Sequence, residues 1–412
     1  MQKQHYLRLG LVAAFAIETI CITYALRFPD LASYNSIGYF FCGISIGVII
    51  LFFPQAKKAS VQFSHSRQNY LKLSLIVIIG ILLCYFSNAV MQEIPVDYRN
   101  ADMLPVIKTM NQRFLNGQWK QVYDNIPEIW NGSKPIYLPA MWLPFLPAVA
   151  ANIDMRWITV TCLFLATVIP MLFLSFKKMN AVVLTATVSV LLWWLLSEND
   201  THGFISFSEE GVVALFYVLL AVALISERII FISVASCLCM LSRYALIGWL
   251  PAFFIYLLAN KKIKPALIFA FTGMLFLFFA FIIPFGWQPF LRLLHLPGNY
   301  IDFSQRVWHD SPEVFTDYIG FAKFFAPERI RLLHMLLIVL TFIIPNAFIL
   351  FCNAYKKKYS LYNIPLATLK ISVVVFYNFI DVPYLYLFYT STFVSLVAVI
   401  FFAGRDEQMQ LQ

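Results

Sequence analysis

The chain has 412 residues, of which 61% are hydrophobic and only 12% are charged. A soluble globular domain carries about 25% charged residues, so this composition excludes that class. The formal net charge of +9 comes largely from lysine and arginine in loops between apolar segments. It therefore indicates membrane topology rather than nucleic-acid binding.

Apolar segments alternate with polar breaks along the chain, a pattern typical of helical membrane spans. Continuous apolar runs exclude a strand-built barrel, which alternates with period two. The sequence therefore predicts a single all-α polytopic membrane domain over residues 1–412, with about 10–13 transmembrane helices. The candidate spans are 8–26, 37–54, 73–90, 156–176, 180–197, 211–226, 229–241, 245–259, 266–286, 330–353, 364–380 and 383–403.

Basic residues gather in loops that fall on one side of the membrane if these spans are correct. They are Lys57, Lys58, Arg67 and Lys72, then Lys177 and Lys178, then Lys261, Lys262 and Lys264, then Lys356, Lys357 and Lys358. The positive-inside rule places this side in the cytoplasm. The two long polar loops, 91–155 and 287–329, then face the non-cytoplasmic side.

Glu18, Lys370 and all the cysteines lie inside the predicted spans. Intramembrane charges are costly and often functional, but Glu18 is isolated, so a packing role at a helix interface is at least as plausible as a site. Lys370 falls inside a span near the C-terminus. The cysteines suggest buried, inert thiols without a disulfide or zinc framework; they are Cys21, Cys42, Cys84, Cys162, Cys237, Cys239 and Cys352.

The loop 91–155 carries the strongest chemical pattern. Asp97 and Asp102 follow the third span closely, and Asp102 suits the N-cap of a helix that would stop at Gly117. Apolar residues share one face of this amphipathic helix, which we expect to lie on the membrane surface; they are Met103, Ile107, Met110 and Phe114. A carboxylate here is well placed to activate a hydroxyl beside a lipid-borne donor.

The segment 119–147 is rich in tryptophan, tyrosine and proline. The aromatic residues suit a membrane interface, whereas the prolines argue against one straight span. We therefore expect a re-entrant or broken helix that lines a cavity, because irregular backbone at membrane depth must be shielded by protein or water.

Later polar residues give weaker signals, each with a structural alternative. Glu209 and Glu210 resemble ordinary carboxylates at a helix N-terminus, and with His202 they resemble a metal cluster only loosely. Arg243, followed by Tyr244, interrupts apolar sequence and should find a phosphate or a carboxylate, unless its side chain snorkels to the interface or has a purely structural partner.

In the loop 287–329 we expect a brief interfacial helix at the start. His309 and Asp310, near Arg306, offer a general-base or sugar-binding pair, although sequence neighbours are more often part of a solvated loop. The chain contains no Walker A loop, dinucleotide fingerprint or nucleophile elbow. This argues against a nucleotide-driven pump and a nucleotide-sugar enzyme of the cytosol.

The first loop resembles that of the GT-C superfamily of integral-membrane glycosyltransferases, in particular bacterial polyprenyl-phosphate-sugar-dependent mannosyltransferases. The likeness covers about 60 residues and runs through Asp97, the phrase RFLNGQWKQVYD and the return KPIYLPAMWLPFLP. Two features depart from the family's pattern. The loop follows the third span rather than the first, and Asp97 and Asp102 do not form a tight Asp-x-Asp, so metal use is not implied.

The resemblance implies inverting transfer from a polyprenyl-phosphate-linked sugar to a glycan or glycolipid acceptor at the outer face of the bacterial inner membrane. Asp97 would be the general base. No cofactor is implied, although a divalent cation is compatible with the chemistry. Candidate substrate-binding residues are Arg99, Asp102, Tyr137, Arg243, Tyr244, Arg306 and His309.

Two alternatives remain open. A transporter or flippase for a lipid-linked saccharide would use the same arginine and aromatic residues without chemistry, although the halves show no convincing repeat. A membrane glycan polymerase or ligase would instead depend on the loop 287–329.

Overall fold

The computed structural model describes residues 2–23, 28–54, 67–99, 101–130, 132–172, 203–325 and 327–403. Within these ranges the chain is helical, with one isolated β-bridge between Ile126 and Ser133 and no strand. Six helices are long and apolar enough to cross a membrane, and six further apolar helices are shorter. The protein is therefore an all-α, multi-pass membrane protein, as the sequence predicts.

The helices run in chain order as follows: α1 Gln2–Thr23, α2 Ala32–Ile50, α3 Arg67–Glu93, α4 Met103–Leu115, α5 Pro139–Trp142, α6 Leu146–Ala150, α7 Arg156–Leu172, α10 Phe204–Phe207, α11 Glu210–Ser226, α12 Ile229–Met240, α13 Trp249–Ala259, α14 Ile263–Leu277, α15 Ile283–Phe285, α16 Trp287–Asp310, α17 Glu313–Thr316, α18 Ile330–Tyr359, α19 Ile364–Asn378 and α20 Leu385–Ala398. A π-helical segment, Phe278–Ile282, joins α14 to α15, and another, Val399–Ala403, follows α20.

The expected spans agree with these helices, except that 180–197 and the ends of 8–26 and 156–176 lie outside the described residues. The segment 139–150 is a broken helix, as its prolines predict: α5, a 3-10 turn over Leu143–Phe145, and α6.

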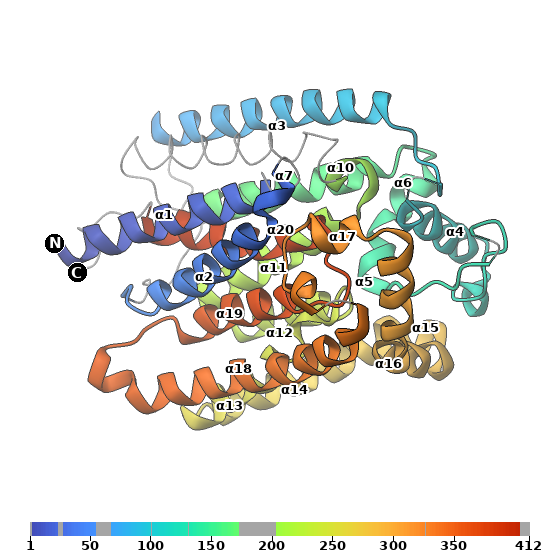
Figure 1. Cartoon of the computed structure of the whole chain (residues 1–412). Helices are drawn as coiled ribbons and strands as arrows, with labels where there is room; N and C mark the ends of the chain where they lie inside the picture. The colour runs from blue at the N-terminus through green and yellow to red at the C-terminus, as the bar shows by residue number, and fades with distance from the viewer. Residues whose placement is uncertain are drawn as a thin grey trace.

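Most helices lie side by side in one elongated bundle, and α1 begins at one end of it (Figure 1). Helix α20 forms the centre, since 94% of the apolar 18-residue stretch within Leu385–Ala403 is buried inside the protein. Helix α3 lies at the edge, and only 28% of the corresponding apolar stretch within Leu73–Glu93 is buried. Cys84 on α3 is consequently exposed, in contrast to the expected burial of every cysteine.

Close helix packing depends on glycine at the α2–α19 contact. A Cβ atom on Gly43 would lie 2.5 Å from Val374 Cγ2, and one on Gly47 would lie 2.6 Å from Ile371 Cγ1. Such small residues four apart let membrane helices approach closely, where dispersion rather than the hydrophobic effect drives association.

Glu18 and Lys370 meet in the bundle interior, although 352 positions separate them. Lys370 Nζ donates to Glu18 Oε1 at 2.6 Å, to Ser391 Oγ at 2.6 Å and to the Ser391 carbonyl at 3.0 Å. Ser395 Oγ donates to the other carboxylate oxygen of Glu18 at 2.7 Å. Both charged side chains are fully buried. Glu18 is therefore paired, and this network joins α1, α19 and α20.

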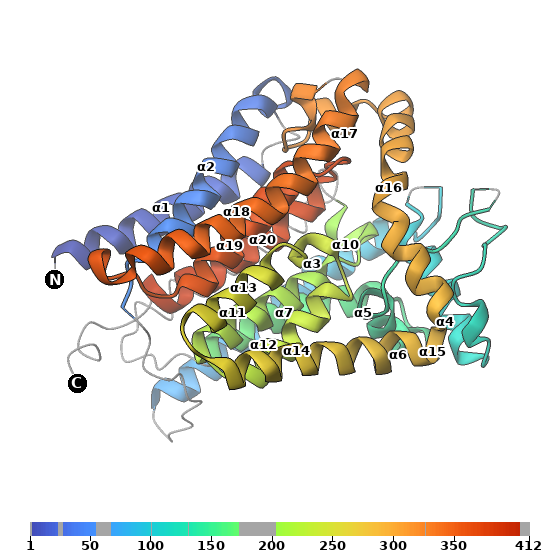
Figure 2. The same ribbon diagram turned by 90° about the horizontal axis from the view of Figure 1, so that it is seen from below.

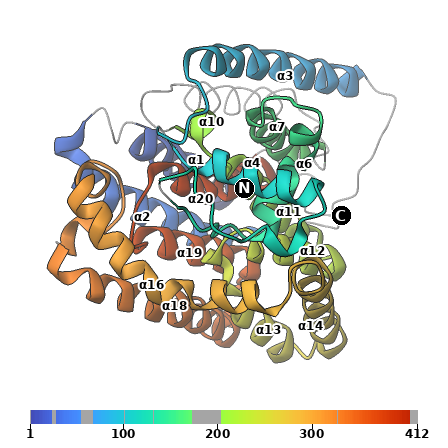
Figure 3. The same cartoon turned by 90° about the vertical axis from the view of Figure 1, so that its right-hand side faces the viewer.

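The end of the bundle away from the start of α1 is covered by α4, α5 and α16, and is called here the α4–α16 end (Figure 1). Helix α16 crosses this end of the bundle at a steep angle to the other helices (Figures 2 and 3). The sequence predicted only a brief helix here, but α16 spans 24 residues. It continues because both halves are anchored: Tyr244 Oη donates to the carbonyl of Leu293 at 2.7 Å, and Ser304 Oγ donates to the carbonyl of Asp381 at 2.8 Å.

Candidate functional site

Helix α4 confirms the amphipathic helix predicted after the third span, but its apolar face does not lie on the membrane surface. Ile107 and Met110 are fully buried, whereas Lys108 on the other side is exposed. The apolar face packs against the broken segment α5–α6, and Asn111 Nδ2 donates to the carbonyl of Trp142 at 3.0 Å. The returning chain thus covers the surface that the sequence assigned to lipid, and it fixes α4 to the bundle.

Polar side chains from five parts of the sequence converge at α16, and this group is called here the polar cluster. It comprises Asp102, Tyr137, Glu209, Glu210, Arg243 and Tyr300.

The centre of the polar cluster is an arginine held by two carboxylates. Arg243 Nη2 donates to Glu209 Oε1 at 2.8 Å and also to Glu210 Oε1. Both glutamates are fully buried, while 22% of the Arg243 side chain is exposed. Thr390 Oγ1 on α20 donates to the second oxygen of Glu210 at 3.3 Å. Arg243 therefore finds the anion that its apolar surroundings demand, and that anion is part of the protein.

Local sequence explains how the two glutamates reach Arg243. Ser208 accepts the Glu210 N–H through its side-chain oxygen at 2.9 Å, which satisfies a backbone donor at the start of α11. Glu209 takes the N-cap position, so both carboxylates lie at the positive end of the helix dipole. Two carboxylates facing one guanidinium leave a net negative charge, and Glu209 Oε2 and Arg243 Nε are buried without a partner among the described residues.

Asp102 brings a further carboxylate to this cluster. It takes the N-cap position of α4, as the sequence predicts, but its side chain caps no backbone N–H. The carboxyl group is half-buried, and burial raises its pKa. Burial also raises the pKa of Tyr137, and the nearby negative charges of Glu209 and Asp102 raise it further. Asp102 is thus a carboxylate in a desolvated setting that is not used to hold the helix together.

Asp97 and Arg99 lie outside the polar cluster, in the connection between α3 and α4. Asp97 is half-exposed, and its Oδ1 accepts the backbone N–H of Arg99 at 2.9 Å in a local turn. The Arg99 side chain is exposed and lies 5.9 Å from the ring centroid of Tyr98. The predicted role of Asp97 as general base and that of Arg99 in binding remain predictions.

Helix α16 is tied to the first loop by Arg292, which the sequence connected only with the polymerase or ligase alternative. Arg292 donates to the carbonyl of Tyr123 at 3.0 Å and to that of Pro135 at 3.1 Å. Tyr300, further along α16, is half-buried. It lies close enough to Arg243 and Asp381 for their charges to shift its pKa. These contacts hold α16 over the polar cluster.

The two candidate residues near the end of α16 have different surroundings. Arg306 is exposed, and His309 pairs with its neighbour Asp310 at 3.0 Å with 89% of its side chain exposed. A buried histidine–aspartate pair lies elsewhere: His334 Nδ1 and Asp381 Oδ2 are 2.6 Å apart. Sequence reasoning missed this pair because 47 positions separate its members, and only a histidine inside an apolar span could have signalled it.

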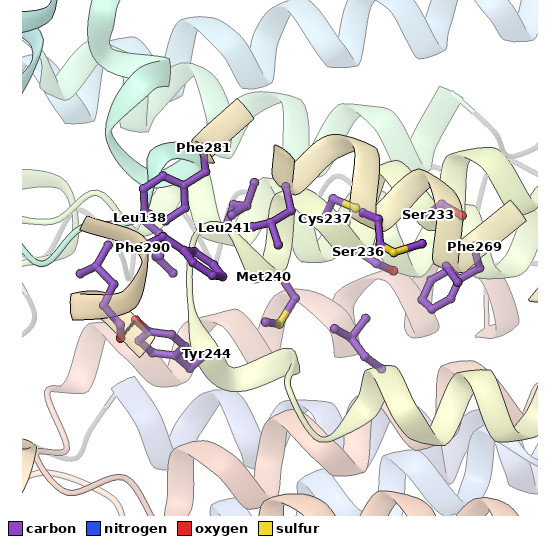
Figure 4. Close-up of a pocket in the computed structure, with 16 residues that line it drawn as sticks. Leu138, Ser233, Ser236, Cys237, Met240, Leu241, Tyr244, Phe269, Phe281 and Phe290 are labelled. Carbon is purple, nitrogen blue, oxygen red and sulfur yellow. Dashed lines mark hydrogen bonds between the residues drawn. The ribbon is translucent and has the colours of Figure 1, made fainter. Parts of the chain in front are cut away.

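An apolar cavity of about 350 Å³ opens beside the polar cluster. Leu138 and Tyr244, which follow Tyr137 and Arg243 in the sequence, line one end of it (Figure 4). The cavity continues between α12 and α14 to Ser233 and Phe269. A cavity of this shape and composition suits a hydrocarbon chain whose polar end reaches the cluster.

Among the residues that the structure describes, no group of three or more His, Cys, Asp or Glu side chains is placed to hold a metal ion. His202, with which the sequence suggested a loose metal cluster, lies outside the described residues. The fold and the site define a multi-pass helical membrane protein with a buried ionic centre and an adjoining apolar cavity. Comparison with protein-family models, with curated proteins and with solved structures finds no match.

Proposed function

We propose that the protein is a membrane glycosyltransferase that moves a sugar from a polyprenyl-phosphate donor to a hydroxyl of a glycan or glycolipid acceptor, with inversion. The observation that carries the proposal is that Asp102, a half-buried carboxylate that caps no helix, belongs to the polar cluster with Arg243. The residues that follow Tyr137 and Arg243 in the sequence line an apolar cavity. A lipid-linked donor needs an apolar site for its hydrocarbon chain, a cationic partner for its phosphate, and beyond them a base near the sugar and the acceptor. The α4–α16 end offers a candidate for each.

In this reaction the base removes the proton of the acceptor hydroxyl, and the hydroxyl oxygen attacks the anomeric carbon from the face opposite the phosphate. The bond between the anomeric carbon and the phosphate oxygen breaks, and polyprenyl phosphate leaves with the electron pair. We assign the base to Asp102 in place of Asp97, because Asp102 lies in the polar cluster and the contacts of Asp97 are local. A raised pKa also makes a carboxylate a better proton acceptor.

Arg243 is the candidate partner of the donor phosphate. Glu209 and Glu210 fix its orientation, and the exposed part of its side chain leaves room for a ligand. Developing charge on a leaving phosphate is stabilised best by a donor that is already oriented. The start of the polyprenyl chain would occupy the apolar cavity, whose volume of about 350 Å³ lies in the range of small-molecule sites.

The proposal places the α4–α16 end on the non-cytoplasmic side of the membrane. Lys262 and Lys356 line one cavity near the opposite end, so the basic turns of α13–α14 and α18–α19 share a side. The positive-inside rule assigns that side to the cytoplasm. Residues 1–412 would then act on lipid-linked substrates at the outer face of a bacterial inner membrane.

The test is sugar transfer by the purified protein in lipid nanodiscs, with polyprenyl-phosphate sugars as donors and mass spectrometry of the products. We expect Asp102→Asn to reduce the turnover about 10²- to 10⁴-fold, the usual contribution of a general base, while donor binding persists. Asp97→Asn is the matched variant, because it makes the same change outside the polar cluster, and it should keep most of the activity. Parallel reactions with a chelator test for a divalent cation.

The opposite ranking of the two variants would return the base to Asp97. Undiminished transfer in both variants would refute this site, and the loop 287–329 with Arg306 and His309 would become the next target. Saturable donor binding by the wild type without transfer of any sugar would favour a carrier of lipid-linked saccharides.

A further inference from the structure

A second cavity, of about 190 Å³, lies near the other end of the bundle from the polar cluster. Three helix–helix turns enclose it: α11 to α12, α13 to α14, and α18 to α19. In Figures 1 and 2 the α18–α19 turn lies toward the end of the bundle where α1 begins and far from α16. The cavity is therefore separate from the proposed site of sugar transfer, and the inference drawn from it does not rest on that function.

Two lysines from different turns line this second cavity. Lys262 precedes α14, and its Nζ lies 6.0 Å from the ring centroid of Tyr256. Lys356 lies in the last turn of α18 and is half-buried. In the ranges that the structure covers, neither ammonium group forms an ion pair with a carboxylate. With Glu227 also in the lining, the cavity has a net positive charge and suits an anion.

The backbone of the three turns is unusual. Among the described residues, six other than glycine have a positive φ, and four of them lie in these turns. They are Glu227 with φ 55°, Lys261 with φ 57°, Ser360 with φ 50° and Asn363 with φ 50°. Glycine is the usual residue at such positions after a helix, because other side chains are strained there. Backbone strain of this kind gathers at ligand-binding sites.

Exposed apolar side chains lie in the same turns as the cavity-lining residues. Ile263 is 62% exposed and Leu258 is 45% exposed, and both flank Lys262 along the chain. Tyr359 and Tyr362 are 49% and 38% exposed in the α18–α19 turn. A water-soluble anion would gain nothing from these side chains, whereas the acyl chains of a lipid would cover them.

We propose that this cavity binds the headgroup of an anionic phospholipid, with the phosphate between Lys262 and Lys356 and the acyl chains against the apolar rim. Basic pockets between membrane helices are a recognised way to hold such headgroups. Membrane topology alone requires positive charge on this side of the protein, at any loop position. A lipid site requires positive charge at Lys262 and Lys356 in particular, so variants at these positions can be compared with variants at neighbouring lysines.

The test uses the full-length protein in neutral detergent and measures its melting temperature and lipid adducts by native mass spectrometry. Added lipids are dioleoyl-phosphatidylglycerol and dioleoyl-phosphatidylcholine, and glycerol 3-phosphate supplies the headgroup without chains. The test variant is Lys262→Gln/Lys356→Gln. The matched control is Lys264→Gln/Lys357→Gln, which removes the same charge from exposed neighbours that do not line the cavity.

We expect phosphatidylglycerol to bind and stabilise the wild type and the control, with little effect of phosphatidylcholine or glycerol 3-phosphate. Each lysine should contribute about fivefold to affinity, so the test variant should bind phosphatidylglycerol about 25-fold more weakly. Equal loss of binding in both variants would reduce the effect to general surface charge and overturn the proposal. Equal stabilisation by both lipids, or by glycerol 3-phosphate, would also overturn it.

Discussion

The buried ion pair between Glu18 and Lys370 makes a sharp prediction about stability. Lys370→Met keeps the length of the side chain but removes the ammonium group, so the Glu18 carboxylate would keep only hydroxyl partners. Breaking one partner of a buried pair costs about 3–5 kcal/mol, because the remaining charge is uncompensated. The membrane setting points the same way, since an unpaired charge at a helix centre costs about 2.5–3.5 kcal/mol. We expect Lys370→Met to lose about 3–5 kcal/mol of unfolding free energy.

Removing both charges should restore most of this loss. In Glu18→Leu/Lys370→Met no charge remains buried, and Ser395 Oγ still donates to the carbonyl of Ser391, 3.3 Å away. Replacing a buried pair by apolar residues is often neutral or stabilising. The double variant should therefore lie within about 1–2 kcal/mol of the wild type, on the usual scale for volume-conserving changes in a packed core.

Unfolding of the purified variants in mixed micelles of detergent and sodium dodecyl sulfate, followed by intrinsic fluorescence, measures these differences. Lys264→Met is the control, because this lysine is exposed and its loss should change stability by no more than about 0.5 kcal/mol. The single variant Glu18→Leu completes the cycle. If the double variant is as unstable as the sum of Lys370→Met and Glu18→Leu, the two residues are not coupled and the reasoning fails.

Two further predictions concern Asp102 and Gly248. Because burial raises the Asp102 pKa, the folded protein keeps a proton that the unfolded chain has released, so stability falls as pH rises through this window. Asp102→Asn should therefore melt at a higher temperature than the wild type at pH 7 but not at about pH 4, near the pKa of a free aspartate. If the variant and the wild type melt at the same temperature at pH 7 as well as at pH 4, this reasoning is contradicted. A Cβ on Gly248 meets the backbone carbonyl of Thr341, so Gly248→Ala should lose about 3 kcal/mol or more; Gly273→Ala, with 3.9 Å of clearance from Cys237, should be almost neutral in the same unfolding assay.

The spans and the class of protein could be predicted from the sequence because each apolar run has to be long enough for a bilayer and polar residues end it. The extent of α16 could not be predicted. Its sequence contains Pro297 and Gly298, which ordinarily end a helix. The contacts of Leu293 and Ser304 on either side stabilise one continuous helix, and these come from distant parts of the chain.

The candidate site was predictable in its residue types but not in its pairings. The sequence indicates that Arg243 must find an anion, because an unpaired arginine is costly among apolar residues. That argument does not identify the partners, Glu209 and Glu210, which lie more than 30 positions earlier. The visible pair His309–Asp310 is exposed, while His334 and Asp381 meet only through the fold. Spacing along the chain reports contacts within one helix, and contacts between helices depend on the packing of the whole bundle.

The centre of the bundle is also the part that is synthesised late. Glu18 enters the membrane with α1, whereas Lys370 follows 352 residues later and α20 later still. Glu18 therefore gains its ammonium partner only when α19 and α20 dock against α1. Maturation of this protein should accordingly be sensitive to anything that delays its last two helices, even though the first ones are already in place.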